Sequence, residues 1–214
     1  MIKGLIFSLD GVIADLDGIH LAAWQRTCSD LGFRFDRNDY TLLKNLSSNR
    51  AAQLILDLAG ARYSESDIDR LCRKKRQYFL QETGSLQSSA LTTGILEFIT
   101  QSSDAGFLNC ALSSNTDTSA VLEKLGAADL FDCISDQPDV SAEQMLERTA
   151  DAMKLLPSEC ILFDRRLAVI AAARSLSMRT VGYAASETAS CSDYCINSFL
   201  NLDVQILIRK IQGE

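Results

Sequence analysis

The sequence contains no apolar run that approaches the roughly 20 residues needed to cross a membrane. Its first apolar run, residues 4–7, is also too short for a signal peptide and is soon interrupted by Asp10. We therefore expect a cytoplasmic protein that has no membrane partner.

Cysteine pairs with CxxC spacing are missing too. An odd number of cysteines, in a chain expected in the cytoplasm, argues against a disulfide framework and favours small buried residues. Cys191 and Cys195 are separated by three residues and have no second ligand pair, which disfavours a zinc site. The seven cysteines are Cys28, Cys72, Cys110, Cys133, Cys160, Cys191 and Cys195.

Positive charge is scarce, with 21 Lys and Arg residues against 28 Asp and Glu residues and a net charge of −7. Nucleic acids bind clustered Lys and Arg, so the composition predicts no nucleic-acid partner. One basic run, residues 73–76, lies within a helical pattern and is interpreted as a solvated helix face.

Short apolar runs alternate with amphipathic helical patterns along most of the chain. The alternation predicts an α/β fold with a doubly wound parallel sheet, in which ligands bind beyond the carboxyl ends of the strands. The strand-like runs are residues 5–7, 107–112, 133–134, 160–163, 180–183 and 195–196.

No strand-like run occurs between residues 15 and 85, where helical patterns cover residues 19–31, 49–58 and 66–81. We interpret residues 15–86 as a small helical cap domain inserted after the first strand. Residues 1–14 and 87–214 then form the core domain, and the Ser-rich residues 84–90 form the second hinge.

Six segments together resemble the haloacid dehalogenase superfamily and, within it, the β-phosphoglucomutase-like subfamily. They occur in the family's order and extend over the whole chain. The segments are FSLDGVIAD at residues 7–15, HLAAW at 20–24, LKNLS at 43–47, ALSSN at 111–115, and AVIAAARS with MRTVG at 168–175 and 178–182.

The resemblance implies a nucleophilic Asp that becomes phosphorylated, a second Asp that acts as general acid and base, and Mg²⁺ between the carboxylates and the phosphate. Ser8 stands at the nucleophile position, whereas Asp10 keeps the acid/base position. A hydroxyl is a much weaker nucleophile than a carboxylate at neutral pH and a poorer Mg²⁺ ligand.

Three later motifs of the family are only partly kept. Ser113 matches the phosphate-binding hydroxyl, although a Ser after a buried strand equally fits a helix N-cap. Ala142 stands at the position of the family's lysine. Asp164 keeps one metal-binding acid, but Arg165 replaces the next, and a cation there repels Mg²⁺.

The resemblance also suggests substrate-binding positions, of which some are kept and some are replaced. Ser48 stands where an arginine would grip the distal phosphate, and Asn45 where a glycine is usual. His20 and Trp24 also fit a purely packing role on an amphipathic helix. The expected substrate-binding residues are His20, Trp24, Lys44, Ser48, Ser114 and Asn115.

Two functions follow. The first is a catalytically inactive relative with a binding or regulatory role, which needs no cofactor and which could serve as a partner of an active relative. The second is an active Mg²⁺-dependent β-phosphoglucomutase or sugar-phosphate phosphatase. The expected ligand is a small phosphorylated sugar, and the sequence identifies no protein partner.

In the inactive protein, a cation must balance the remaining carboxylates. We expect Arg165, or failing that Arg166, to lie close to Asp10 or Asp164 in place of the metal.

Overall fold

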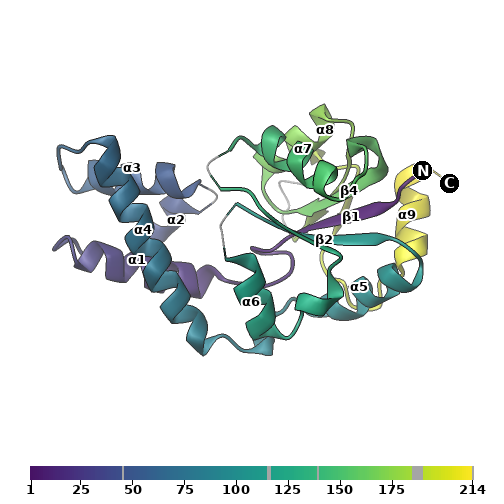
Figure 1. The fold of residues 1–214 in the computed structure, drawn as a ribbon, viewed down its shortest axis with the longest axis horizontal. Coiled ribbons are helices and arrows are strands. Elements are labelled where there is room, and N and C mark those ends of the chain that lie inside the picture. Colours follow the sequence, from purple (N-terminus) through teal and green to yellow (C-terminus); the bar gives the residue numbers. More distant parts are fainter. Residues whose placement is uncertain (45, 115–116, 139, 185–189, 214) are drawn as a thin grey trace. The chain divides into compact units, whose positions relative to one another are not determined.

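The computed structural model of the chain describes residues 1–214 except 45, 115–116, 139, 185–189 and 214 (Figure 1). The described residues form two compact units. The core unit comprises Met1–Asp15 and Gln87–Glu214, and the cap unit comprises Leu16–Leu86. One of the expected substrate-binding residues, Asn115, lies outside the described residues.

The core unit contains a six-stranded parallel sheet with the strand order β3-β2-β1-β4-β5-β6. The chain moves outward from β1 in one direction and then returns to β4 on its other side, so the strand order reverses between β1 and β4. The predicted doubly wound parallel fold is confirmed. The strands are β1 (Gly4–Ser8), β2 (Leu108–Ser113), β3 (Cys133–Asp136), β4 (Cys160–Asp164), β5 (Arg179–Tyr183) and β6 (Tyr194–Ile196).

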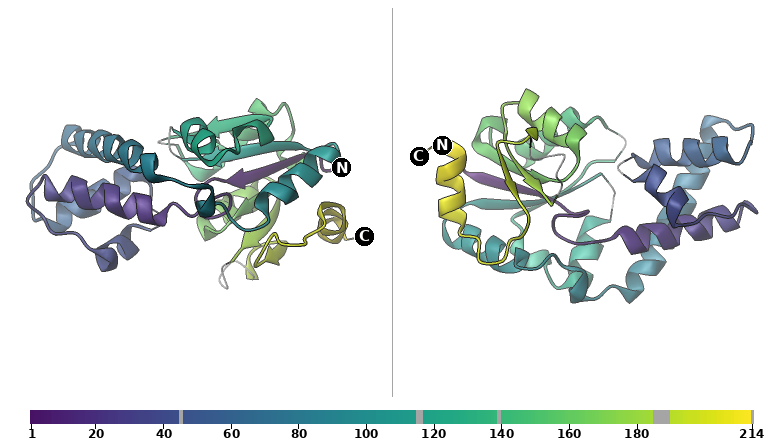
Figure 2. Two further views of the ribbon diagram at one scale, coloured as in Figure 1. Left: turned by 90° about the horizontal axis from the view of Figure 1, so that it is seen from below. Right: turned by 180° about the vertical axis from the view of Figure 1, so that it is seen from behind.

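Helices cover both faces of this sheet (Figure 2). Every residue of β1 is buried, as expected for a central strand that packs on both faces. Ile6 packs in a cluster with residues of α7 and α8, whereas the ring of Phe7 stacks on Phe163 and meets Phe98 of α5 edge-on. The core helices are α5 (Ile95–Asp104), α6 (Thr118–Leu125), α7 (Ala142–Ala152), α8 (Leu167–Ser175) and α9 (Val204–Gln212).

The cap unit is helical, and the three predicted helices are present as α1, α3 and α4. Sequence analysis missed α2, a helix of seven residues that begins at a capping box between Asp36 and Asp39. Such a short helix shows little periodicity, so its signal was the cap alone. The cap helices are α1 (Asp17–Ser29), α2 (Arg37–Leu43), α3 (Ser48–Leu58) and α4 (Glu65–Glu82).

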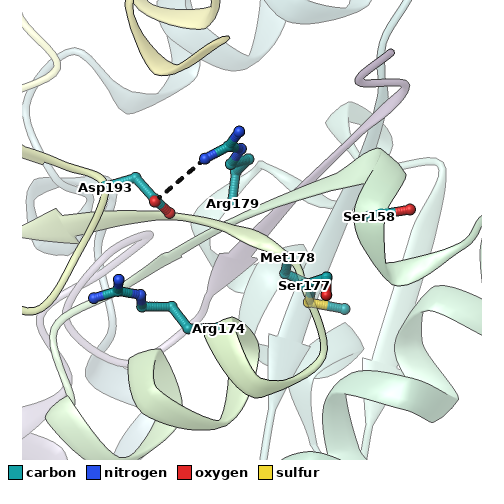
Figure 3. A pocket seen from close by; sticks show the side chains of 6 residues that line it. All are labelled: Ser158, Arg174, Ser177, Met178, Arg179 and Asp193. Carbon is teal, nitrogen blue, oxygen red and sulfur yellow. Dashed lines mark ion pairs between the residues drawn. The ribbon is translucent and has the colours of Figure 1, made fainter. Parts of the chain in front are cut away.

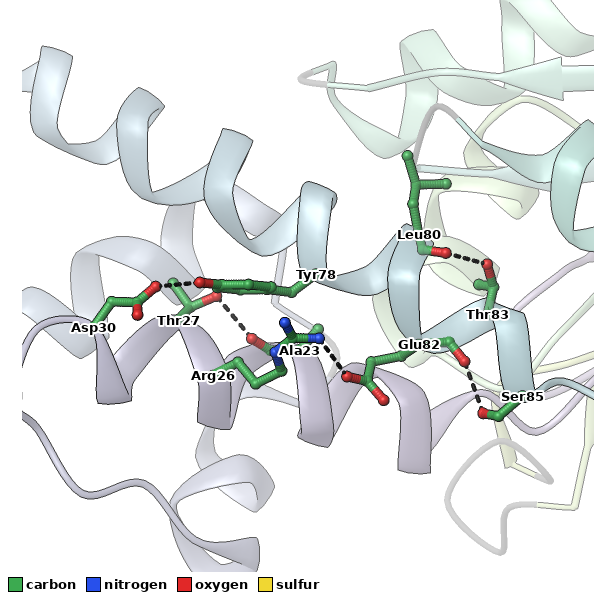
Figure 4. Close-up of polar contacts among 9 residues, drawn as sticks. All are labelled: Ala23, Arg26, Thr27, Asp30, Tyr78, Leu80, Glu82, Thr83 and Ser85. Carbon is green, nitrogen blue, oxygen red and sulfur yellow. Dashed lines mark hydrogen bonds and ion pairs between the residues drawn. The ribbon is translucent and has the colours of Figure 1, made fainter.

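Polar side chains on the surface join α1 to α4 (Figure 4). Arg26 pairs with Glu82 at 2.8 Å, and its guanidinium carbon lies 4.1 Å from the centre of the Tyr78 ring. The Tyr78 hydroxyl donates a hydrogen bond of 2.5 Å to Asp30. These contacts fix the spacing of the two longest helices of the cap unit.

The basic run of α4 is only partly a solvated face. Arg73, Lys74 and Arg76 are exposed, as predicted, but Lys75 is 5% exposed. The prediction was wrong for Lys75 because this residue continues the buried stripe of Ile68, Leu71 and Phe79 rather than the exposed side of the helix.

All seven cysteines are free thiols, and only Cys191 is exposed. Among the helices that the structure describes, none combines the length and apolar character needed to cross a bilayer.

Candidate active site

Ser8 and Asp164 meet at the point where the strand order reverses. Phe7 and Phe163 are register partners on β1 and β4, so the next residue on each strand lies beside the other on the same face of the sheet. The Ser8 hydroxyl donates a hydrogen bond to Oδ2 of Asp164. Both residues are buried, with 1% and 0% of their surface exposed. Ligands bind in doubly wound sheets at this edge.

Arg166, the N-cap residue of α8, binds the Asp164 carboxylate through both its backbone and its side chain. Its backbone N–H donates to Oδ1 at 2.7 Å, which forms a tight turn over two residues at the start of α8. The same turn brings the guanidinium onto the carboxylate, with Nε 3.1 Å from Oδ1 and Nη2 2.7 Å from Oδ2. The planar fork therefore engages both oxygens of Asp164.

Asp164 thus accepts four hydrogen bonds, two at each oxygen. An ionised carboxylate offers about four lone-pair positions. Because the side chain has no exposed surface, all of its acceptor capacity is used within the protein.

The Arg166 side chain is 19% exposed, and its guanidinium carries the charge that balances the Asp164 carboxylate. Burial alone would lower its pKa, but the charge of Asp164, the hydrogen bonds to it and the charge of Asp10 together raise the pKa above its ordinary value. Nη2 also lies 3.4 Å from the Ser8 hydroxyl oxygen. Arg166 therefore stays protonated beside Ser8 and Asp164.

The prediction that an arginine would approach these carboxylates is confirmed for the second of the two named residues, Arg166. The Arg165 side chain lies across the loop that follows β1. A Cβ atom added at Gly11 would meet the Arg165 side chain, with Cδ at 2.6 Å, and Gly11 has a φ of 80°. The guanidinium of Arg165 thus passes over Gly11, the residue after Asp10. Asp10 itself is half-buried.

The residues at this edge do not fit the Mg²⁺ ion that the family resemblance implies. Mg²⁺ requires oxygen ligands with available lone pairs in octahedral geometry. Those of Asp164 are occupied, and Ser8 offers a hydroxyl whose proton is already donated. Within the described part of the chain, no three His, Cys, Asp or Glu side chains are grouped so that they could hold a metal.

Ser113 ends β2 beside the same edge, one residue beyond the Leu112 partner of Ser8, and is buried. Its alternative interpretation as a helix N-cap is wrong, because α6 begins at Thr118 and Asp117 occupies the N-cap position. Ser114 follows it and is half-buried.

Ala142, at the predicted lysine position, is the first residue of α7. The Ser141 hydroxyl caps this helix by accepting a hydrogen bond of 3.2 Å from the Gln144 backbone N–H, and the Ser141 backbone N–H donates to Oε1 of Gln144 at 3.2 Å. Ala142 packs at the margin of the core and brings no charge to the site.

In the cap unit, Lys44 is the C-cap residue of α2. Its ammonium pairs with Asp17 at 2.6 Å, and the Tyr40 hydroxyl donates to the same carboxylate at 3.2 Å. Ser48 is the first residue of α3 and is half-buried. The two expected substrate-binding residues therefore lie at successive helix ends.

His20 and Trp24 lie on α1 around Lys75, a buried cation that sequence analysis did not single out. The Lys75 ammonium lies 2.9 Å from Nδ1 of His20 and faces the rings of Phe79 and Trp24, with its nitrogen 4.8 and 5.8 Å from their centres. Trp24 is 4% exposed and packs in the cap core. A lysine within an apolar helical stripe was the signal that could have identified this cluster.

A separate hollow of about 350 Å³ lies at the opposite, amino-terminal edge of the sheet, near the end of α8 (Figure 3). Within it, Arg179 pairs with Asp193 at 3.5 Å. It is distant in the fold from Ser8 and Asp164, so it is not part of the candidate site. It is lined by Ser158, Arg174, Ser177, Met178, Arg179 and Asp193.

Comparison with known proteins agrees with this fold. The chain is 26% identical over 211 residues to the β-phosphoglucomutase of Bacillus subtilis, which covers 96% of this chain and 93% of that protein. It is 26% identical over 187 residues to the fructose-1-phosphate phosphatase of Escherichia coli, covering 83% of this chain and 94% of that protein.

The crystal structure of β-phosphoglucomutase from Clostridium difficile superposes with a TM-score of 0.89 at 25% identity, over 100% of this chain and 98% of that one. The family described as haloacid dehalogenase-like hydrolase matches residues 5–183. The chain therefore belongs to the haloacid dehalogenase-like hydrolases and is β-phosphoglucomutase-like within them.

Proposed function

We propose that this protein binds a small phosphorylated sugar without transferring its phosphoryl group, and that it acts as a binding or regulatory member of its family. The observation that carries the proposal is the complete use of the Asp164 acceptors by Ser8 and Arg166. A carboxylate in this state cannot also hold a metal unless the arginine leaves.

The proposal is supported by the nature of the group at the nucleophile position. The Ser8 hydroxyl donates its proton to Asp164, and Arg166 approaches its oxygen at 3.4 Å. A serine hydroxyl is a much weaker nucleophile at neutral pH than the carboxylate that the family has at this position. Loss of a catalytic nucleophile alone costs on the order of 10⁶ in rate in a well-studied hydrolase.

Phosphate binding does not need the lost groups. Arginine side chains and hydroxyl groups bind phosphate oxygens directly, and two arginines and Ser113 lie at or beside the carboxyl edge of the sheet. The relatives named for phosphoglucomutase and fructose-1-phosphate phosphatase activity make a sugar phosphate the first ligand to test.

An active Mg²⁺-dependent phosphoglucomutase or phosphatase is the second candidate. It is favoured by Asp10, which keeps the acid/base position and remains half-buried in the loop after β1. In this case Arg166 would have to release Asp164 when the substrate binds.

The test measures turnover of β-glucose 1-phosphate and of p-nitrophenyl phosphate with Mg²⁺, alongside calorimetric binding of β-glucose 1-phosphate without Mg²⁺. We expect wild-type turnover at background and metal-independent binding. A variant carrying Ser8→Asp, Ala142→Lys, Arg165→Asp and Arg166→Ser should gain Mg²⁺-dependent turnover, because it restores the acids and the lysine and frees Asp164.

Asp10→Asn in the restored variant is the matched control, because it should remove the gained activity if the activity arises at this site. Wild-type turnover that requires Mg²⁺ and disappears on Asp10→Asn would establish the second candidate instead. Absence of both turnover and binding would contradict the sugar-phosphate ligand.

A further inference from the structure

Two cysteines lie side by side on the core sheet, away from the candidate active site. Cys110 of β2 and Cys133 of β3 are register partners on adjacent parallel strands. Cys110 is a buried member of the packed cluster that includes residues of α7, and Cys133 packs against the same cluster. Register partners on adjacent strands point to the same face of the sheet, so the two side chains are neighbours although the residues are distant in sequence.

The backbone just before the two cysteines fixes their register. The N–H of Asn109 donates to the Asp132 carboxylate at 2.8 Å, and the N–H of Asp132 donates to the Asn109 carbonyl at 2.9 Å. These bonds hold the amino end of β3 against β2, so the thiols remain neighbours in the folded protein.

The two thiols differ in access to solvent. Cys110 is fully buried in the centre of the sheet, whereas Cys133 is half-buried at the first residue of β3, the edge strand. A small oxidant can therefore reach Cys133 from solvent, whereas Cys110 lies buried on the neighbouring strand.

We propose that Cys133 and Cys110 form an oxidant-sensitive dithiol, a modification site at which a peroxide closes a disulfide between β3 and β2. The reaction begins when the Cys133 thiolate attacks one peroxide oxygen. The O–O bond breaks, hydroxide leaves, and Cys133 becomes a sulfenic acid. Cys110 then attacks the Cys133 sulfur, so that an S–S bond forms and the S–O bond breaks.

The second step releases hydroxide, which takes the Cys110 proton to form water. In total, two thiols and one hydrogen peroxide give one disulfide and two waters, and a thiol reductant reverses the change. Neighbouring strands are about 4.8 Å apart, within the Cα separation of about 4.4–6.8 Å that disulfides span.

The ionisation of the pair supports this order of events. The neighbouring Cys110 thiol lowers the pKa of Cys133, although burial and Asp132 oppose the effect. The Cys133 thiol beside it, together with burial, raises the pKa of Cys110. The more accessible sulfur is thus also the one that forms the reactive thiolate.

The experiment treats the folded full-length protein with an excess of hydrogen peroxide, blocks the remaining thiols under denaturing conditions and maps tryptic peptides without reduction. Cleavage after Lys and Arg places Cys110 in residues 77–124 and Cys133 in residues 125–148, each as the only cysteine of its peptide. We expect a linked pair of these two peptides and the loss of two of the seven free thiols.

Cys133→Ser is the test variant and Cys191→Ser its control, because Cys191 is exposed and outside the pair. The linked peptide should disappear in the first variant and persist in the second. Cys133 is half-buried at the start of the edge strand, so we expect the serine variant to fold. An unfolding midpoint equal to that of the wild type checks this. Oxidation of Cys191 or Cys195 while Cys110 stays alkylatable, or a Cys133 sulfinic acid without linkage, would overturn the proposal.

Discussion

Arg166 in the core unit and Lys75 in the cap unit are both cations withdrawn from water, but their surroundings differ. Arg166 is matched by the Asp164 carboxylate through three hydrogen bonds, two from its guanidinium and one from its backbone. Lys75 lies against the imidazole of His20 and the faces of Phe79 and Trp24.

This difference shows two ways of stabilising a buried cation. A guanidinium fork on a carboxylate is directional and uses up the acceptor's lone pairs, so it specifies one arrangement and excludes a metal. Ring faces attract a cation without a directed hydrogen bond. For Lys75 to donate to Nδ1, His20 must be neutral and carry its proton on Nε2. The Arg166 fork thus occupies the lone pairs of its acceptor, whereas Lys75 also gains from the ring faces beside it.

The largest effect should come from removing the cation at the core edge. Arg166→Ala leaves Asp164 buried without its counter-charge, and the loss of one partner of a buried pair costs about 3–5 kcal/mol of unfolding free energy. Urea unfolding of the purified variant measures this cost. Adding Asp164→Asn should recover part of the stability, because the uncompensated charge is then removed.

Arg70→Ala removes the same charge from an exposed ion pair with Asp67 and serves as the control, with an expected loss smaller than that of Arg166→Ala. Equal losses for the two variants would mean that the pair with Asp164 has no special role in stability. The contrast drawn between Arg166, which is paired with a carboxylate, and Lys75, which lies beside aromatic rings, would then have no basis in stability.

Replacing a glycine by alanine should change the free energy of unfolding by a smaller amount, and with opposite sign at Gly11 of the core unit and Gly18 of the cap unit. Gly11 has a φ of 80° and its added Cβ would meet Arg165, so Gly11→Ala should cost about 1–2 kcal/mol. Gly18 lies exposed on α1 with nothing within 4 Å of an added Cβ, so Gly18→Ala should gain up to about 1 kcal/mol.

Thermal unfolding of both glycine variants checks this contrast. A stabilised Gly11→Ala would show that the loop after β1 is not constrained by the Arg165 side chain. Of the two arginines, only Arg166, through its pair with Asp164, would then constrain this edge of the sheet.

The smallest effect concerns the exposed cap contacts of Asp30. Hydrogen bonds from Lys74 and Tyr78 lower the pKa of Asp30 below its ordinary value of 3.8. A carboxyl group whose pKa is depressed on folding contributes stability that is present above its unfolded pKa and is lost as the pH falls through the folded pKa. The contribution should therefore disappear on acidification below about pH 3.8.

Lys74→Met removes the largest cause of this depression. The difference in unfolding midpoint between the wild type and Lys74→Met should be small at neutral pH, shrink below pH 3.8 and shrink further in high salt, since the group is exposed. A difference that stays constant through acid would show that packing of the Lys74 side chain, not its charge, is responsible.

Most of the fold could be predicted because its signals are local. Alternating apolar runs located all six strands, and the absence of such runs located the helical insert. The short α2 was missed because seven residues give too little periodicity. Lys75 was interpreted as solvated together with its basic neighbours, although its spacing from Ile68, Leu71 and Phe79 fits the buried stripe of α4. A spacing pattern also cannot say which rings and which imidazole surround it.

The sequence by itself determined which chemical groups stand at the carboxyl edge of the sheet: a hydroxyl at Ser8, a carboxylate at Asp164 and two neighbouring arginines. Only the tertiary structure decided that Arg166, not Arg165, holds Asp164. That choice depends on the turn at the start of α8 and on the register of β1 and β4, which joins residues 156 positions apart. Charge and residue type are properties of the chain, whereas the use of each lone pair depends on which strands become neighbours.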